Sequence, residues 1–184
     1  MVGFALWQKP SILIQSATMN ITQYFAKGEY DPTELIAECG TIKLRGKDLK
    51  CRKGVEFGAR VYKFIPSAEK PIPVGLRKFI EENGIPITPK IQVVVHYYEK
   101  GGSIGSHSDK IGKLEEGSKI YSISFLLDNH PSTMSWENED YYWNKTLRHK
   151  EFLVWNSKEH WERKIKHEVK DSGKRINITI RTSK

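Results

Sequence analysis

The chain has 184 residues, of which 38% are hydrophobic, and its formal net charge is +8. This length is sufficient for one domain with a sizeable core, two cysteines exclude a disulfide framework, and no apolar run reaches the length of a membrane span. The start of the sequence also lacks the basic leader of a secretory signal. We therefore expect one intracellular, monomeric domain over 1–184 that does not act on membranes; a cytoplasmic location is the simplest, and a nuclear one stays open.

The first half of the chain predicts two helices. Asp31, Pro32 and Glu34 are typical of a helix N-terminus, and Gly40 marks a stop, so a short helix is predicted over 32–39. Apolar residues at helical spacing predict a second helix over 74–83, before a Gly and a Pro. No element type is assigned to residues 1–30.

A basic segment lies between these helices. Over 43–63 eight basic residues face two acidic ones, a surplus of six. Phe57, Tyr62 and Phe64 are interleaved with them, and basic residues mixed with aromatic ones suit a phosphate backbone and an unstacked base. Two alternatives stay open: the charges form an ordinary solvated face, and the aromatic residues belong to the core.

Short strands are predicted from residue 89 onward. They cover 91–98, 104–109, 118–127, 133–137, 151–155, 165–169 and 175–181. Tyr121, Ile123 and Phe125 alternate with Ser122 and Ser124 in the third of them. Regular short strands behind a helical front favour a mainly β (α+β) fold, a double-sheet jelly roll with the two N-terminal helices packed outside.

Two polar patterns in these strands suggest chemistry. A strand places His107 and Asp109 on one face, and an imidazole and a carboxylate, completed by a second histidine, form the ligand set of non-haem iron(II) oxygenases. A polar turn with a solvated His and Asp is the alternative. In the last strand the two faces differ. One face has the polar residues Arg175, Asn177, Thr179 and Arg181, and the other has the isoleucines Ile176, Ile178 and Ile180.

The polar face of the last strand has two interpretations. An edge strand would turn it to solvent, whereas a buried strand would line a cavity in which two arginines bracket a small dianion. Arginine suits the second role because its planar fork binds carboxylates and keeps its charge.

These motifs resemble the AlkB family of iron(II)- and 2-oxoglutarate-dependent dioxygenases. The resemblance spans roughly 41–181 and rests on His107-x-Asp109, a later histidine, and Arg175-x-Asn177-x-Thr179-x-Arg181. It extends upstream to Tyr98-x-x-Gly101-Gly102-x-Ile104-Gly105-x-His107, and Arg52 with Phe57-Gly58 and Tyr62 is more faintly similar to the substrate-covering lid. It implies a double-stranded β-helix, with 1–88 as N-terminal extension and lid and 89–184 as catalytic core.

The resemblance also implies roles for single residues. His107, Asp109 and His167 would bind iron(II), with His160 as the rival for the third position. The residues implied to hold 2-oxoglutarate are Tyr98 and Arg175, with Arg181 nearer the metal and Asn177 and Thr179 between them. Those implied to contact substrate are Arg52, Phe57 and Tyr62.

This sequence departs from the family pattern at two places. His96 stands where the family usually has an asparagine that contacts the cosubstrate, so that contact is altered. Ile111 and Gly112 follow the metal pair where many members have acidic residues that read the damaged base, so the choice of base stays open.

The implied function is oxidative demethylation of N-alkylated bases in single-stranded or flipped-base RNA or DNA. It would consume O2 and 2-oxoglutarate and release formaldehyde, succinate and CO2. Two alternatives remain: a 2-oxoglutarate-dependent hydroxylase of proteins or small molecules, and a non-catalytic nucleic-acid-binding module. The sequence leaves open DNA against RNA and the identity of the base.

Overall fold

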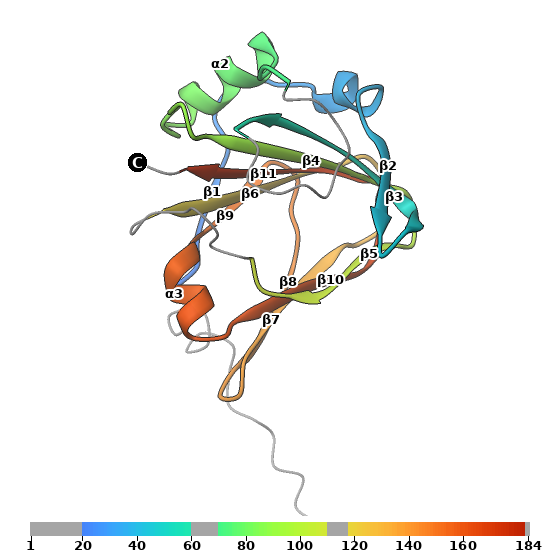
Figure 1. The fold of residues 1–184 in the computed structure, drawn as a ribbon, viewed down its shortest axis with the longest axis vertical. Helices are drawn as coiled ribbons and strands as arrows, with labels where there is room; N and C mark the ends of the chain where they lie inside the picture. Colours follow the sequence, from blue (N-terminus) through green and yellow to red (C-terminus); the bar gives the residue numbers. More distant parts are fainter. Residues whose placement is uncertain (1–19, 60–69, 110–117, 183–184) are drawn as a thin grey trace, which may run out of the picture.

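The computed structural model describes residues 20–59, 70–109 and 118–182 and shows two β-sheets stacked as layers, with a helix across the outer side of the larger one (Figure 1). The elements in chain order are β1 Thr22–Phe25, the 3-10 helix η1 Pro32–Ile36, β2 Gly40–Leu44, β3 Lys47–Gly58, α2 Val74–Glu82, β4 Gln92–Tyr98, β5 Gly102–His107, β6 Lys119–Leu126, β7 Thr133–Glu137, β8 Tyr142–Thr146, β9 Glu151–Asn156, α3 Ser157–Glu162, β10 Lys166–Ser172 and β11 Arg175–Thr182. None of the helices in these ranges has the length and apolarity needed to cross a membrane.

All paired strands are antiparallel, and they form one large and one small sheet. The large sheet has seven strands in the order β1-β9-β6-β11-β4-β3-β2, and the small sheet has four in the order β5-β10-β7-β8. The predicted mainly β, double-sheet architecture is confirmed. The strands that precede residue 89 also belong to the large sheet, because β3 pairs with β4 along its length and β1 pairs with β9.

The large sheet is apolar on its outer face and polar on part of its inner face. Ile176, Ile178 and Ile180 of β11 are fully buried in a core cluster that also contains Phe79 and Ile80 of α2. Burying such side chains under the helix stabilises the sheet by about 2 kcal/mol each. Because β11 is the fourth of seven strands, the edge-strand interpretation is wrong. Its isoleucine face packs under α2, and its polar face lines the space between the sheets.

The helices agree only in part with the sequence prediction. Helix α2 matches the predicted range closely, and the carboxylate of Asp31 caps η1 by accepting from the amide of Thr33 at 2.9 Å. The expectation of only two helices was wrong, since α3 follows β9 directly. The amide oxygen of Asn156 caps α3 by accepting from the N–H of Glu159 at 2.9 Å. Strand β8 was also missed.

Candidate metal centre

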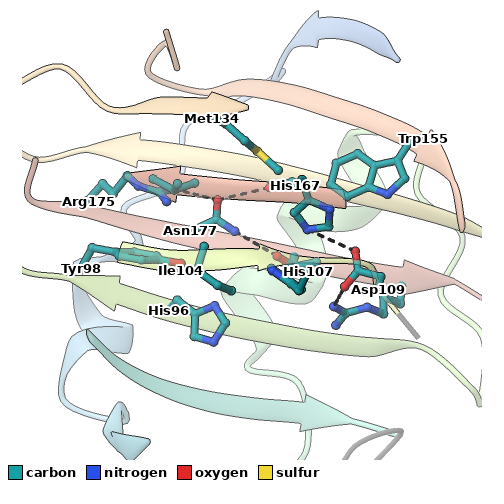
Figure 2. A pocket seen from close by; sticks show the side chains of 14 residues that line it. His96, Tyr98, Ile104, His107, Asp109, Met134, Trp155, His167, Arg175 and Asn177 are labelled. Carbon is teal, nitrogen blue, oxygen red and sulfur yellow. Dashed lines mark hydrogen bonds and ion pairs between the residues drawn. The ribbon is translucent and has the colours of Figure 1, made fainter. Parts of the chain in front are cut away.

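Strand pairing brings two histidines from distant parts of the sequence together. His107 ends β5, and His167 lies opposite it on the neighbouring strand β10. Directly opposed residues on an antiparallel pair have neighbouring side chains, and the two imidazole centroids are 4.4 Å apart. Figure 2 shows the ring of His167 facing Asp109, with His107 close to both.

Asp109 completes a cluster of three potential metal ligands. One ligand atom from each of His107, Asp109 and His167 lies within 4.8 Å of the others. The Nε2 atom of His167 is 3.6 Å from Oδ2 of Asp109, whose other oxygen accepts from the guanidinium of Arg181 at 2.7 Å. This is the set of two imidazoles and one carboxylate that the sequence predicted.

The protonation and orientation of these groups suit metal binding. The Nδ1 atom of His107 lies 2.8 Å from the carbonyl oxygen of Gly105, which leaves Nε2 as the ligand atom. Burial lowers the pKa of His167 to about 4, only partly opposed by Asp109, so this imidazole is neutral at neutral pH. Burial would raise the pKa of Asp109, but Arg181 and the two imidazoles hold it well below its ordinary value.

The rival histidine has a different place. His160 lies in α3, is buried, and stacks on the ring of Trp155 with centroids 5.9 Å apart. The same indole contacts His167 edge-on at 5.5 Å. The geometry therefore brings His167, and not His160, into the cluster.

A buried arginine lies at the other end of the same interior space (Figure 2). Arg175 is 1% exposed, and its Cζ atom is 4.1 Å from the ring centroid of Tyr98. Its guanidinium donates to Ser172 at 2.8 Å, to Ser124 at 3.0 Å and to Asn177 at 2.9 Å. No carboxylate of the described residues forms an ion pair with it, so this buried cation has only neutral partners.

The side chain of Asn177 connects β11 to the neighbouring strand β6. Its side-chain oxygen accepts from Arg175, Ser122 and Ser124, and its amide nitrogen donates to Thr179 at 2.9 Å. The asparagine lines the cavity, but its hydrogen-bonding atoms are occupied by neighbours. It therefore orients the guanidinium of Arg175 within the sheet.

Two adjoining cavities meet at the cluster. The smaller, of about 60 Å³, lies between the sheets and is lined by Tyr98, Arg175 and the three potential ligands, among others. The larger, of about 440 Å³, lies between β2, β3, β4 and β5 and also contacts His107, Asp109 and Arg181. His96 lines both, and burial together with nearby arginines lowers its pKa to about 3, so it is neutral there.

The residues predicted to contact substrate lie in different parts of the structure. Arg52 is 9% exposed and lines the larger cavity, and its Nε and Nη1 atoms have no hydrogen-bond partner among the described residues. The prediction for Phe57 was wrong, because its side chain points to the outer face of β3 and is 2% exposed in the core under α2. Tyr62, Ile111 and Gly112 lie outside the described residues.

Sequence reasoning missed several residues that organise the site. They are Ser122, Ser124, Ser172, Gln92 and Glu56. The alternation of Ser122 and Ser124 with large apolar residues was a usable signal, since it marks the same inward face as the polar residues of β11. Nothing in the sequence alone pairs Gln92 or Glu56 with the site.

No protein-family model matches the chain, and no curated protein matches it by sequence. Among solved structures, it is similar to OsALKBH1, with a TM-score of 0.58 and 17% identity over 89% of this chain and 98% of the other. The chain shares a mainly β, antiparallel jelly-roll fold with this structure, and it also carries a His–Asp–His cluster. A prolyl-4-hydroxylase from Pseudomonas putida is also similar, with a TM-score of 0.53 and 13% identity over 91% and 94% of the two chains. At these identities the likeness establishes the jelly-roll fold.

Proposed function

We propose that this chain is an iron(II)- and 2-oxoglutarate-dependent dioxygenase that demethylates N-alkylated bases in RNA or DNA. One observation carries the proposal: a cluster of two imidazoles and one carboxylate shares an interior space with a buried arginine that forms no ion pair with a carboxylate of the described residues. The first feature fits a divalent iron, and the second fits a dicarboxylate cosubstrate.

The donor set fits iron(II) because it supplies three ligands from one side. Two neutral imidazoles and one carboxylate are the mixed nitrogen and oxygen ligands of non-haem iron(II) sites, which keep other positions open. His107, Asp109 and His167 would hold the metal, and Arg181 fixes the carboxylate of Asp109. When bound, iron(II) with 2-oxoglutarate and O2 supplies the oxidising chemistry that converts a methyl group to formaldehyde, with succinate and CO2 as the other products.

Arg175 fits one carboxylate of 2-oxoglutarate. A buried guanidinium without a counter-charge has lost its hydration and gains most from an anion that binds its planar fork. Tyr98 contacts the guanidinium, Asn177 and Ser124 orient it, and β11 places it on the same strand face as Arg181. These residues would hold the cosubstrate between the arginine and the metal, away from bulk water.

The side of the site that faces outward suits a polyanion. The β2–β3 hairpin borders the larger cavity and carries exposed basic side chains, with the single exposed acid Asp48 paired with Lys43 at 3.9 Å. The exposed basic residues are Lys43, Arg45, Lys47, Lys50 and Lys53. Such a hairpin would contact the phosphate backbone while an unpaired base enters the cavity beside Arg52.

A second candidate is a hydroxylase of protein side chains or small molecules with the same metal and cosubstrate. The lining of the larger cavity favours it, because the described residues there include aliphatic side chains and no Phe, Tyr or Trp for stacking on a base. The aliphatic residues are Ile42, Leu44, Leu49, Val94 and Ile104.

Two measurements test the proposal. Anaerobic titration of the protein with iron(II) and 2-oxoglutarate should give a visible metal-to-ligand charge-transfer band, and folded protein without the band would exclude the dioxygenase. Methylated RNA and DNA oligonucleotides should then release formaldehyde in the presence of O2. Turnover of a peptide or metabolite and of no oligonucleotide would favour the second candidate.

A further inference from the structure

A chain of hydrogen bonds crosses the large sheet and ends on a potential metal ligand. The guanidinium of Arg181 donates to Asp109 at 2.7 Å and to the side-chain oxygen of Gln92 at 3.1 Å. The amide nitrogen of Gln92 donates in turn to a carboxylate oxygen of Glu56. The chain thus runs from β3 through β4 and β11 to the residue that completes the metal cluster.

Asp109 depends on this chain for its position. It lies beyond the end of β5, outside the described backbone pairing between β5 and β10. Arg181 belongs to β11 in the middle of the large sheet, and its planar fork is held by Asp109 on one nitrogen and Gln92 on the other. A fork fixed at two points has few alternative orientations, and it transfers the rigidity of the sheet to Asp109.

Gln92 links the two charged ends in only one orientation. It is 0% exposed, and its oxygen faces a guanidinium while its nitrogen faces a carboxylate. Rotating the amide by half a turn would place like partial charges against both neighbours and lose both hydrogen bonds. The position of the Glu56 carboxylate is therefore connected to that of the Arg181 guanidinium through Gln92.

Glu56 is the end of the chain that a ligand can reach. It lines the larger cavity and is 6% exposed. One of its oxygens accepts from Gln92, and no described residue donates to the other. Arg52 lies four residues away on the same face of β3, yet the two form no ion pair, because Gly54 stands between them and the strand separates their backbones by about 13 Å.

A half-satisfied carboxylate in a cavity wall attracts one kind of ligand group. Burial without a full set of donors is costly for a charged carboxylate, so an N–H group or a protonated nitrogen is favoured at this point. A carbonyl oxygen in the same place would repel it. The cavity therefore discriminates between ligands of equal size by the presence of a donor.

We propose that Glu56 binds a hydrogen-bond donor of the ligand in the larger cavity and that Gln92 and Arg181 transmit this contact to Asp109, so that such a ligand tightens metal binding. The inference rests on the proposed metal centre and adds substrate selection and regulation of that centre. A donor that holds Glu56 also orders Gln92 and Arg181 in advance, and the metal then meets an Asp109 that is already oriented. Linkage requires the effect to be reciprocal, so bound metal also tightens the ligand.

The full-length protein with Mn(II) in place of iron provides the test. The dissociation constant for Mn(II) is measured from the electron paramagnetic resonance signal of the free ion, with and without nucleoside probes. The probes are 3-methylcytidine and 3-methyluridine, which carry the same methyl group and differ at position 4. There the first has an amine, as part of a base that is a cation near neutral pH, and the second has a carbonyl oxygen. We expect 3-methylcytidine to lower the dissociation constant about fivefold or more and 3-methyluridine to leave it unchanged.

Two variants and a control locate the effect. Glu56→Gln still accepts from Gln92 but turns an NH2 group to the cavity, so the Mn(II) dissociation constant of this variant should be the same with and without 3-methylcytidine. Gln92→Leu breaks the chain and should weaken Mn(II) binding about tenfold or more without any nucleoside. Glu81→Gln, on the exposed surface of α2, should behave as wild type. Thermal unfolding of each variant verifies that it is folded. If Gln92→Leu does not fold, the result for Glu56→Gln alone decides whether the inference holds.

The outcomes separate this inference from the proposed function. The inference would be overturned if 3-methylcytidine left the Mn(II) dissociation constant of the wild-type protein unchanged, or if its effect persisted in Glu56→Gln. Either result would leave the proposed function intact, since formaldehyde release from oligonucleotides tests that function separately. Unchanged Mn(II) affinity in folded Gln92→Leu would also overturn it. Absence of Mn(II) binding by the wild-type protein would overturn the metal centre, and both proposals with it.

Discussion

Replacing Arg175 by methionine should abolish tight 2-oxoglutarate binding and leave the fold intact. The guanidinium is fully buried and its partners among the described residues are neutral, so the folded protein bears the cost of desolvating this cation. That cost is several kcal/mol and is offset in part by hydrogen bonds that each contribute about 1 kcal/mol. Methionine has a similar length, no charge and no need of partners.

The effect of Arg175→Met on stability should be smaller than its effect on 2-oxoglutarate affinity. Ser124 and Ser172 keep other hydrogen bonds when the guanidinium is removed, to Asn177 and to the carbonyl oxygen of Gly173, so no hydroxyl is stranded. The free energy of unfolding should therefore change by less than about 2 kcal/mol. Loss of a buried charge pair with a ligand carboxylate should cost about 2–4 kcal/mol, which raises the dissociation constant by between about 30-fold and about 700-fold.

Calorimetric titration of 2-oxoglutarate into the Mn(II)-loaded protein without O2 measures the affinity, and urea denaturation measures the stability. Arg148→Met, at an arginine whose side chain is 61% exposed, is the matched control. An unchanged affinity in Arg175→Met would remove the cosubstrate from this end of the cavity. A loss of stability above about 4 kcal/mol would show instead that the buried guanidinium is a structural requirement.

Four further substitutions and one treatment test the remaining assignments. His107→Ala and Asp109→Ala should each abolish the rise in melting temperature that excess Mn(II) gives the wild-type protein, which corresponds to about 2.7 kcal/mol at 100 times the dissociation constant; a rise that survives would remove that ligand. His160→Ala should destabilise the protein by losing its packing on Trp155 yet keep the Mn(II)-dependent rise, as followed by the same melts. Gly54→Ala should lower the free energy of unfolding by about 1–3 kcal/mol in urea denaturation, since its Cβ would lie 3.0 Å from the carbonyl oxygen of Val95, and equal stability would show that the strands can separate there. Chelation of metal from the wild-type protein should reverse the melting-temperature rise, and readdition should restore it.

The fold was predictable where side chains alternate strictly. The period of two in 175–181 predicted β11 and its two faces, and the cap at Asp31 predicted the start of η1. Which face of β11 turns inward was not predictable, because a polar face is equally suited to solvent and to a cavity. The packing of α2 on the isoleucine face decides this point, and this contact between distant segments is a property of the whole chain.

The candidate site was predictable only in its local parts. The two-residue spacing in the sequence relates His107, the last residue of β5, to Asp109 just beyond it, but the third member depends on the register between β5 and β10. Both His160 and His167 follow β9 and precede β11 in the sequence. Helix α3, which the sequence did not predict, places His160 against Trp155, and the same indole contacts His167. The link through Gln92 likewise depends on which residues of β4 lie beside β11.

Charge on the inner face of the large sheet explains why metal and cosubstrate belong together. Three buried arginines, Arg52, Arg175 and Arg181, face two carboxylates, Glu56 and Asp109. A divalent metal would add two positive charges to this poorly hydrated space, and a dicarboxylate would remove as many. Each ligand therefore offsets the electrostatic cost of the other, because charges interact strongly where water is excluded. The apolar outer face under α2 supplies the stability that allows so polar an interior to persist.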